Sequence, residues 1–394
     1  FTRKAADELK VRFQAKLEEA WKNEHDLDIE FRLGEALQNI ERCYLGTVHA
    51  FCAKLLRERP IEAHLDLTFK ELEEADDLDI LEEAWQLYLQ TLMDESPHKF
   101  EQINELGVTV DNLLPWLKGL KEYSDVDWVT EIVPKPVLLP DFQSFILLIK
   151  EAKRSVPDEE PPKGYDVLQK AILTAVQKEK FINPSKDKDI ISVLELFDKH
   201  LKPTYNRWLS KEDAKFYEEK ISAVFEVSIK PLIQAWKEYC HPKIIGFLKE
   251  AVQVYEQLKK ERSLLNFQDL MMHTSKLLRG NPEVRSYFQE KYRYLLVDEF
   301  QDTDPIQAEI MFYLTSEDPN EKTWSNCKPK AGSLFVVGDP KQAIYRFRRA
   351  DIDTYNRVKQ LIEERGGEVL QLTTNFRTLD TVTNELNKVF EMHL

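Results

Sequence analysis

An apolar stretch that ends in two carboxylates is the feature that most constrains this chain. Residues 294–297 are apolar, and Asp298 and Glu299 follow at once. This pattern predicts a buried parallel strand, and ligands of open α/β sheets bind beyond the carboxyl ends of such strands. A second apolar run, residues 334–337, ends in a glycine and an aspartate. The two runs together predict a parallel sheet with its polar chemistry at one edge.

Six segments resemble the motifs of one helicase family, in that family's order. Residues 297–303, Val-Asp-Glu-Phe-Gln-Asp-Thr, resemble motif II of the UvrD/Rep-type superfamily 1 DNA helicases. The other resemblances are residues 338–348 to motif III, 374–378 to motif IV, 1–6 to motif Ia, 46–52 to motif Ib and 266–270 to the DNA-contacting segment before motif II. The sequence of residues 339–352 is more similar to the RecB/AddA branch than to UvrD itself.

The resemblance implies an α/β fold: the parallel sheet of a RecA-like P-loop NTPase, incomplete here, with a large all-helical insertion subdomain. The expected domains are residues 1–60, the first part of motor domain 1A; 61–262, the helical insertion 1B; 263–372, the second part of 1A; and 373–394, the start of a second RecA-like domain, 2A.

Hydrophobic patterns place the expected elements. Helices are predicted over residues 4–22, 304–316, 351–365 and 379–392, and strands at 46–48, 293–298, 333–338 and 368–373. Five of the seven tryptophans, Trp85, Trp116, Trp128, Trp208 and Trp236, lie in the predicted insertion, where most of them should fill a helical core.

A glycine-rich phosphate loop is missing from the sequence. None of the 11 glycines lies in a Gly-x-x-x-x-Gly-Lys-[Ser/Thr] pattern. In the family this loop lies upstream of motif Ia, and motifs V and VI follow motif IV. We therefore expect a helicase fragment that covers most of the first motor domain and the opening of the second. By itself this fragment should be inactive as an ATPase.

The resemblance implies ATP and Mg²⁺ as cofactors and assigns residues to them. Asp298 would be the Mg²⁺ ligand, through water, and Glu299 would orient and deprotonate the attacking water. Gln342 can sense the γ-phosphate because an amide both donates and accepts hydrogen bonds. Arg377 would stabilise charge on the same phosphate as an arginine finger does. Ordinary solvation of a strand end is the simple alternative for the two acids.

Two further positions of motif II have no assigned role. Gln301 and Asp302 resemble residues that couple motif II to the neighbouring motifs, and what each does is left open.

A second group of residues matches the family's DNA contacts. They are Phe1, Thr2, Thr47, His49, Phe267, Tyr345, Phe347 and Arg348. An aromatic ring stacks on any base, and the stacking is worth roughly 1–3 kcal/mol per base. Many relatives carry Trp where this chain has Phe347. Core packing is the alternative for Tyr345 and Phe347, and a satisfied histidine at a helix start is the alternative for His49.

The implied function is an ATP-dependent DNA helicase that moves 3′ to 5′ in DNA repair and recombination. Its partners would be single-stranded DNA, junctions of single- and double-stranded DNA, and a RecC- or AddB-like subunit, with a nuclease domain further along the chain. A non-catalytic DNA-binding scaffold is the alternative. An ATPase that acts on protein is disfavoured by the aromatic and basic residues of motif III.

The net charge of the chain is an objection to DNA binding that the local charge of motif III answers. The net charge is −15, which argues against DNA binding through bulk charge, yet Lys341, Arg346, Arg348 and Arg349 crowd motif III. The acidic run at residues 71–83 is predicted to be a solvated helical face. The four cysteines lack metal-ligand spacing and indicate reduced thiols in a cytoplasmic protein.

Overall fold

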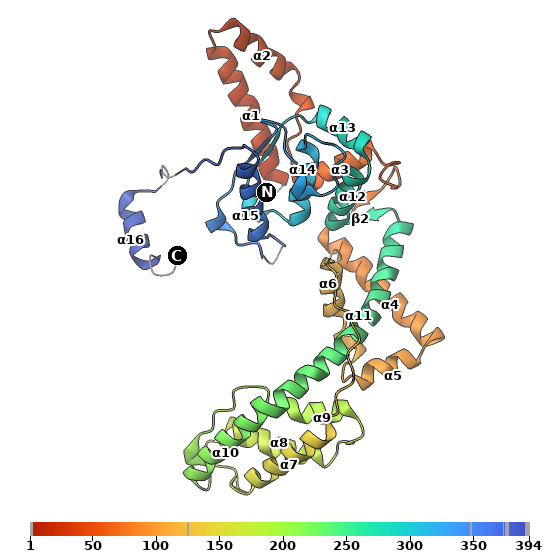
Figure 1. The fold of residues 1–394 in the computed structure, drawn as a ribbon, viewed down its shortest axis with the longest axis vertical. Coiled ribbons are helices and arrows are strands. Elements are labelled where there is room, and N and C mark those ends of the chain that lie inside the picture. The colour runs from red at the N-terminus through yellow and green to blue at the C-terminus, as the bar shows by residue number, and fades with distance from the viewer. Residues whose placement is uncertain (1–2, 124–125, 347–348, 373, 375–377, 391–394) are drawn as a thin grey trace. The chain divides into compact units, whose positions relative to one another are not determined.

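The chain divides into two compact units (Figure 1). The computed structural model describes residues 3–123, 126–346, 349–372, 374 and 378–390. The first unit consists of Phe1–Glu71 and Leu265–Leu394, and the second consists of Leu72–Leu264.

The first unit combines helices with a short parallel sheet. Before the second unit it contains α1 (Arg3–Asn23), α2 (Leu27–Gln38), α3 (Val48–Glu58) and β1 (Lys70–Glu71). After it come β2 (Leu264–Leu265), α12 (Phe267–Gly280), α13 (Pro282–Lys291), β3 (Leu295–Val297), α14 (Pro305–Thr315), β4 (Leu334–Val336), α15 (Ile352–Glu364) and α16 (Asp380–Phe390). Short 3₁₀ turns include η6 (Phe300–Asp302) and η8 (Pro340–Gln342), at the two sequence motifs.

One hydrophobic core holds the first unit together. Helix α12 packs against α3, α13 and α14, which lie together in Figure 1. β3 and β4 pair in parallel and rest on this core through Leu295, Val297, Leu334 and Val336. Their other face is exposed, with Leu296 and Phe335 at 76% and 57%. The prediction of a buried strand is therefore wrong for one of its two faces.

Two predicted strands are absent from the described residues. Residues 368–372 are not a strand, and Leu370 and Leu372 are 81% and 98% exposed. An apolar run becomes a strand only beside a partner strand, which this segment lacks here. Residues 46 and 47 are also not a strand, because Thr47 is the N-cap of α3 and its side-chain oxygen accepts the N–H of Ala50.

The second unit is built from helices that are joined by loops. Its elements are α4 (Glu74–Glu95), α5 (His98–Glu105), α6 (Leu114–Glu122), α7 (Leu139–Lys153), α8 (Val167–Glu179), α9 (Asp187–Leu194), α10 (Lys211–Val224), the π-helix η5 (Phe225–Ile229) and α11 (Lys230–Glu261). The longest of the loops lie between α6 and α7 and between α7 and α8. Helix α11 packs along α4 and α6 and also contacts η5.

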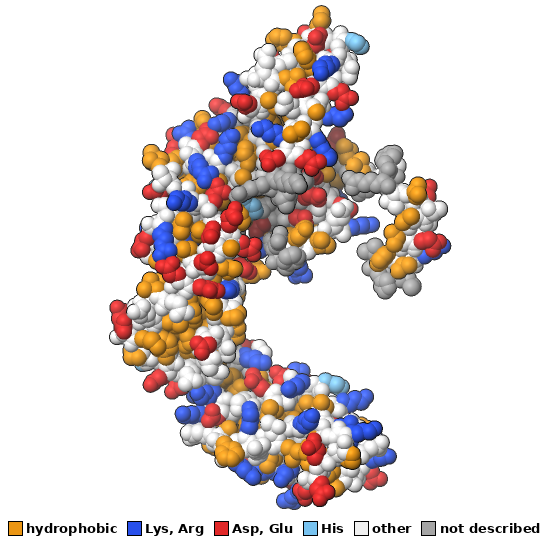
Figure 2. Space-filling view, turned by 180° about the vertical axis from the view of Figure 1, so that it is seen from behind, with side chains coloured by type: hydrophobic (Ala, Val, Ile, Leu, Met, Phe, Trp, Pro, Cys, Tyr) orange, Lys and Arg blue, Asp and Glu red, His pale blue; other side chains and the backbone are white. Residues whose placement is uncertain are grey.

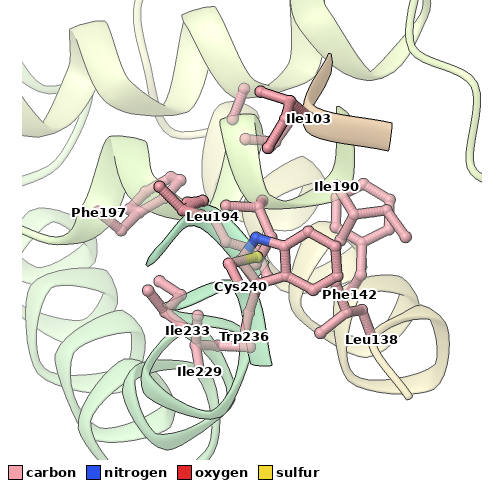
Figure 3. Close-up of a cluster of buried hydrophobic side chains, with 14 of the residues drawn as sticks. Ile103, Leu138, Phe142, Ile190, Leu194, Phe197, Ile229, Ile233, Trp236 and Cys240 are labelled. Atoms are coloured by element: carbon pink, nitrogen blue, oxygen red, sulfur yellow. The ribbon is translucent and has the colours of Figure 1, made fainter. Parts of the chain in front are cut away.

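Aromatic side chains fill the core of this unit. In Figure 3, Trp236 of α11 lies among apolar side chains from α7, α9 and η5. Trp85, Trp208 and Trp236 are buried, and Trp128 packs against the same core while partly buried. The predicted core role is thus confirmed for these four. Trp116 is 52% exposed, so most of the five tryptophans, as predicted, belong to the core.

The acidic run is not entirely solvated. Asp77 of α4 is buried, where it forms an ion pair with Lys121 and accepts the hydroxyl of Tyr255. A buried carboxylate needs such partners because desolvation of an unpaired charge is costly. Most of the neighbouring acids are exposed, as predicted.

The boundaries between the two units differ from the predicted domain boundaries. Residues 61–71 belong to the first unit, and Ala63 and Phe69 are buried in its core. The chain leaves this unit after β1 and returns at β2, and these two strands pair with each other. The separation of residues 373–394 as a further domain stays a prediction.

Charged side chains are mixed over the second unit. Figure 2 shows Lys and Arg beside Asp and Glu over the end that holds α7–α10. Several of them form ion pairs: Lys150–Glu179, Lys220–Glu151, Lys215–Glu219 and Lys230–Glu226. None of the described helices is long and apolar enough to span a bilayer.

We predict that residues 72–264 fold when expressed alone. Among the described residues, those buried in the core of this unit all lie between Leu81 and Leu258, so their burial does not require the first unit. Circular dichroism should show a helical protein with one cooperative urea transition. Trp236→Ala should lower the free energy of unfolding by about 3–5 kcal/mol. A broad, non-cooperative transition of the parent sequence would contradict the prediction.

Candidate functional site

The parallel pairing of β3 and β4 brings the two long sequence motifs side by side. Leu295, Leu296 and Val297 pair with Leu334, Phe335 and Val336. Beyond the strands, the N–H of Val337 donates to the carbonyl of Val297 at 2.8 Å, and the N–H of Phe300 donates to the carbonyl of Val337 at 2.9 Å. Motif II and motif III therefore emerge together at the carboxyl edge of the sheet.

Glu299 has a strained backbone at this edge. Its φ and ψ angles are 54° and 42°, in the left-handed region, which costs a residue other than glycine roughly 1–3 kcal/mol. The N–H of Glu299 donates to Oδ1 of Asp298 at 2.9 Å. Both carboxylates are exposed. Strain of this kind persists only where the surroundings fix it, and it is often found at functional sites.

The two acids fit a magnesium site of the kind that substrate phosphates complete. The described residues contain no group of three or more His, Cys, Asp or Glu side chains that could hold a metal by themselves. Mg²⁺ commonly takes only one or two carboxylates and keeps several waters alongside the phosphates. Asp298, exposed at the strand end, matches that donor set.

Gln301 connects the two motifs through its side-chain amide. Nε2 of Gln301 donates to Oε2 of Glu299 at 2.6 Å, and Oε1 accepts the N–H of Asp339 at 3.0 Å. The orientation of the amide is fixed, because the backbone N–H can only donate. Gln301 is 2% exposed, so water does not compete for these bonds.

Asp339 extends the connection to the predicted phosphate sensor. Its Oδ2 accepts Nε2 of Gln342 at 2.9 Å, and its Oδ1 accepts the N–H of Lys341 at 3.0 Å. The bond from Gln342 and then that from Lys341 hold the pKa of Asp339 below its usual value. Hydrogen bonds thus run from Glu299 through Gln301 and Asp339 to Gln342.

Gly338 allows the two motifs to approach this closely. A Cβ atom at this position would lie 2.9 Å from Oε1 of Gln301 and 3.2 Å from the backbone nitrogen of Phe300. Any side chain would push motif III away from motif II.

The far end of motif III is also attached to motif II. The N–H of Asp351 donates to the carbonyl of Thr303 at 3.3 Å. Arg349 Nε lies 3.3 Å from Oδ2 of Asp304, and both side chains are largely buried. The segment from Asp339, whose N–H donates to Gln301, to Asp351 contains Gln342 and Tyr345. It is therefore fastened to the motif II region at both ends.

Asp302 occupies a partly buried position close to Glu299. Burial, and then the negative charge of Glu299, raise the pKa of Asp302 above its usual value. Its Oδ1 atom is buried and has no hydrogen-bond partner among the described residues. The position therefore disfavours a second charge close to Glu299.

Three of the predicted DNA contacts gather at two helix starts. The rings of His49, at the start of α3, and Phe267, at the start of α12, lie 5.0 Å apart at 48°. Burial lowers the pKa of His49, which favours the neutral ring. Thr47 caps α3.

Tyr345 of motif III is 37% exposed, which disfavours a purely core role for its ring.

The remaining predicted contacts lie outside the described residues. They are Phe1, Thr2, Phe347 and Arg348 for DNA, and Arg377 for the phosphate.

Sequence reasoning missed three contributors to the site. In the sequence Gly338 and Asp339 are only parts of a motif, and no sequence pattern indicates the pair of Arg349 with Asp304. A Gly-Asp pair after a strand is a weak signal, since only the structure shows what the glycine lets approach.

Comparison with known families agrees with this geometry. The family model described as "UvrD/REP helicase N-terminal domain" matches residues 1–363. The chain belongs to this family. A RecA-like P-loop fold follows for the first unit. Among the described residues, β3 and β4 are the parallel strands of its sheet.

Similar curated proteins place the chain in the RecB/AddA branch, as predicted. It is 26% identical to an ATP-dependent helicase/nuclease subunit of Streptococcus pneumoniae strain CGSP14, over 99% of this chain and 35% of that protein. It is 25% identical to exonuclease/helicase subunit RexA of S. pneumoniae TIGR4, over 99% and 35%. The corresponding helicase/nuclease subunit of Enterococcus faecalis is also 25% identical, over 99% and 34%. The chain thus spans about a third of the length of these relatives.

We predict that Gly338→Ala impairs ATP turnover in the full-length protein that contains these residues (the parent protein). The added methyl must displace Gln301 or the loop that carries Gln342. Misplacement by about 1 Å can cost on the order of 100-fold in rate. Gly280→Ala is the matched control, because no described atom lies within 4 Å of its Cβ position. Equal turnover by the two variants in a DNA-stimulated ATPase assay would contradict the prediction.

Proposed function

We propose that this chain provides the ATP-hydrolysing edge of a DNA helicase that moves 3′ to 5′ on single-stranded DNA in repair and recombination. The observation that carries the proposal is the run of hydrogen bonds from Glu299 to Gln342 at the ends of two parallel strands. It joins a candidate base to a candidate phosphate sensor. The names of the relatives, which contain "helicase" and "ATP-dependent", support the same activity.

Each residue at this edge has a proposed task. Asp298 would hold Mg²⁺, which neutralises charge on the phosphates when bound. Glu299 would orient the attacking water and accept its proton. Gln342 would leave Asp339 to contact the γ-phosphate, and Arg377 would stabilise the charge that spreads over it.

The DNA strand would be gripped by two sets of residues. Thr47, His49 and Phe267 form the first set, at the starts of α3 and α12. The second set is Tyr345, Phe347 and Arg348, to which Phe1 and Thr2 are added by the resemblance. Because Tyr345 lies in the segment fastened to motif II, a change at the phosphate sensor would reach the DNA grip directly.

The parent protein would need further parts. These 394 residues contain no glycine-rich phosphate loop, so we propose that turnover requires residues outside them. The relatives are named as subunits, which supports assembly with a second protein of the RecC or AddB kind. Single-stranded DNA and its junctions with duplex would be the substrates, and the cytoplasm the location.

We predict that Glu299→Gln in the parent protein lowers ATP turnover by about 10²- to 10⁴-fold, the contribution of a general base. The amide keeps the shape of the side chain, so binding of ATP and DNA should stay largely unchanged. Glu290→Gln, at an exposed glutamate of α13, is the control and should leave turnover as it is. Turnover within about tenfold of wild type would refute Glu299 as the base. A wild-type parent protein without DNA-stimulated ATP turnover would favour the alternative of a DNA-binding scaffold.

For the second unit we propose the role of the helical insertion subdomain 1B, which contacts duplex ahead of the motor. It enters and leaves at β1 and β2, which pair, so it can be removed without stretching the first unit. It contains none of the residues proposed for ATP chemistry.

Replacement of residues 72–263 in the parent protein by a short Gly-Ser linker, which keeps β1 and β2, tests this role. We expect ATP turnover stimulated by single-stranded DNA to be spared more than duplex unwinding. Circular dichroism and thermal unfolding should confirm that the first unit keeps its fold. Equal loss of both activities in a folded variant would mean that the second unit is part of the motor itself.

A further inference from the structure

We infer that Gln301 is a positioning residue that holds Glu299 in register with the phosphate-sensing loop. This inference rests on the proposed function and adds a residue to it. The side chain of Gln301 touches the carboxylate of Glu299 on one side and the backbone of Asp339 on the other. Glu299 and the loop therefore cannot move independently.

The amide has one possible orientation at this position. Oε1 must face the N–H of Asp339, since that group can only donate. Nε2 then has to face Glu299, whose ionised carboxylate can only accept. Asparagine, methionine or glutamate cannot reproduce both contacts at once. Glutamine therefore suits this position, because its amide reaches Glu299 and the backbone of Asp339 at the same time.

Glu299 needs an external support of this kind. Its backbone is in the left-handed region, with φ at 54°, and its side chain is exposed. The bond from Gln301 is the one that the structure gives to its carboxylate from the described residues. An exposed glutamate without such a bond would sample several rotamers, and the attacking water would lose its alignment.

The surroundings of Gln301 hold its two hydrogen bonds, to Glu299 and to Asp339, in place. Gly338 lets motif III approach until its backbone touches Gln301 and Phe300. The far end of the loop returns to Thr303 and Asp304. The carboxylates of Glu299 and Asp302 repel each other when both are charged, which raises the pKa of Asp302. The amide of Gln301 thus supplies a donor among acidic neighbours.

Two substitutions separate the contacts of Gln301. Gln301→Met keeps the size of the side chain and loses both hydrogen bonds. Gln301→Glu keeps an acceptor for Asp339 and turns a repelling oxygen towards Glu299. If the contact with Glu299 is the one that matters, both variants of the parent protein should lose kcat by about 10- to 100-fold. KM for ATP should stay within about threefold, because Gln301 reaches the base and not the nucleotide.

A second mutation tests whether Gln301 acts through Glu299. In the Glu299→Gln background, Gln301→Met should lower the residual turnover by less than about threefold. Gln289→Met is the matched control. Gln289 is also a buried glutamine, and it donates to the carbonyls of Tyr313 and Ser316. This control should lower the melting temperature while kcat of the folded enzyme stays unchanged.

The outcomes separate this inference from the proposed function. If Glu299→Gln abolishes turnover while Gln301→Met keeps kcat within about threefold, the inference is overturned and the proposed function stands. Equal fold losses in both backgrounds, with a drop in melting temperature like that of Gln289→Met, assign Gln301 a structural role and also overturn it. If Glu299→Gln itself leaves turnover intact, the role of base that the proposed function gives to Glu299 fails first.

Discussion

The parallel pairing of β3 with β4 is the constraint on which the candidate site depends. Parallel strands present their carboxyl ends at the same edge, so two loops that are far apart in the sequence begin side by side. The register, with Leu295 opposite Leu334, then decides which backbone groups meet beyond the strands. It places the carbonyl of Val337 where the N–H of Phe300 can reach it. A shift of one residue would separate Gln301 from Asp339.

Much of this arrangement can be predicted from sequence, because it depends on local pattern. Apolar runs locate β3 and β4 to within two residues, and helical spacing locates α14 and α15. The motif residues Asp298, Glu299 and Gln342 can be assigned from their neighbours in the sequence. The burial of Trp85 and Trp236 follows from their apolar nature and the helical pattern around them.

What escapes prediction depends on contacts between distant residues. The hydrogen bonds of Gln301 require knowledge of where the backbone of Asp339 lies. Asp77 can be buried because Lys121, on another helix, lies close enough to pair with it. The sequence around Asp77 does not reveal this neighbour. Residues 368–372 carry the pattern of a strand, but a strand needs a neighbour with which to pair. Likewise, the limit of the first unit at Glu71 is set by the packing of Phe69.

The carboxyl edge of β3 and β4 takes its rigidity from hydrogen bonds because the two short strands provide little of it. Parallel sheets are commonly covered on both faces, whereas β3 and β4 rest on the core through one face, with Leu296 and Phe335 exposed on the other. Strands of three residues cannot by themselves fix loops that extend well beyond them. The strained backbone of Glu299 persists only if other contacts determine it. Those contacts are the buried amide of Gln301 and the two attachments of motif III, so a change at Gln301 should alter the chemistry before it alters the fold.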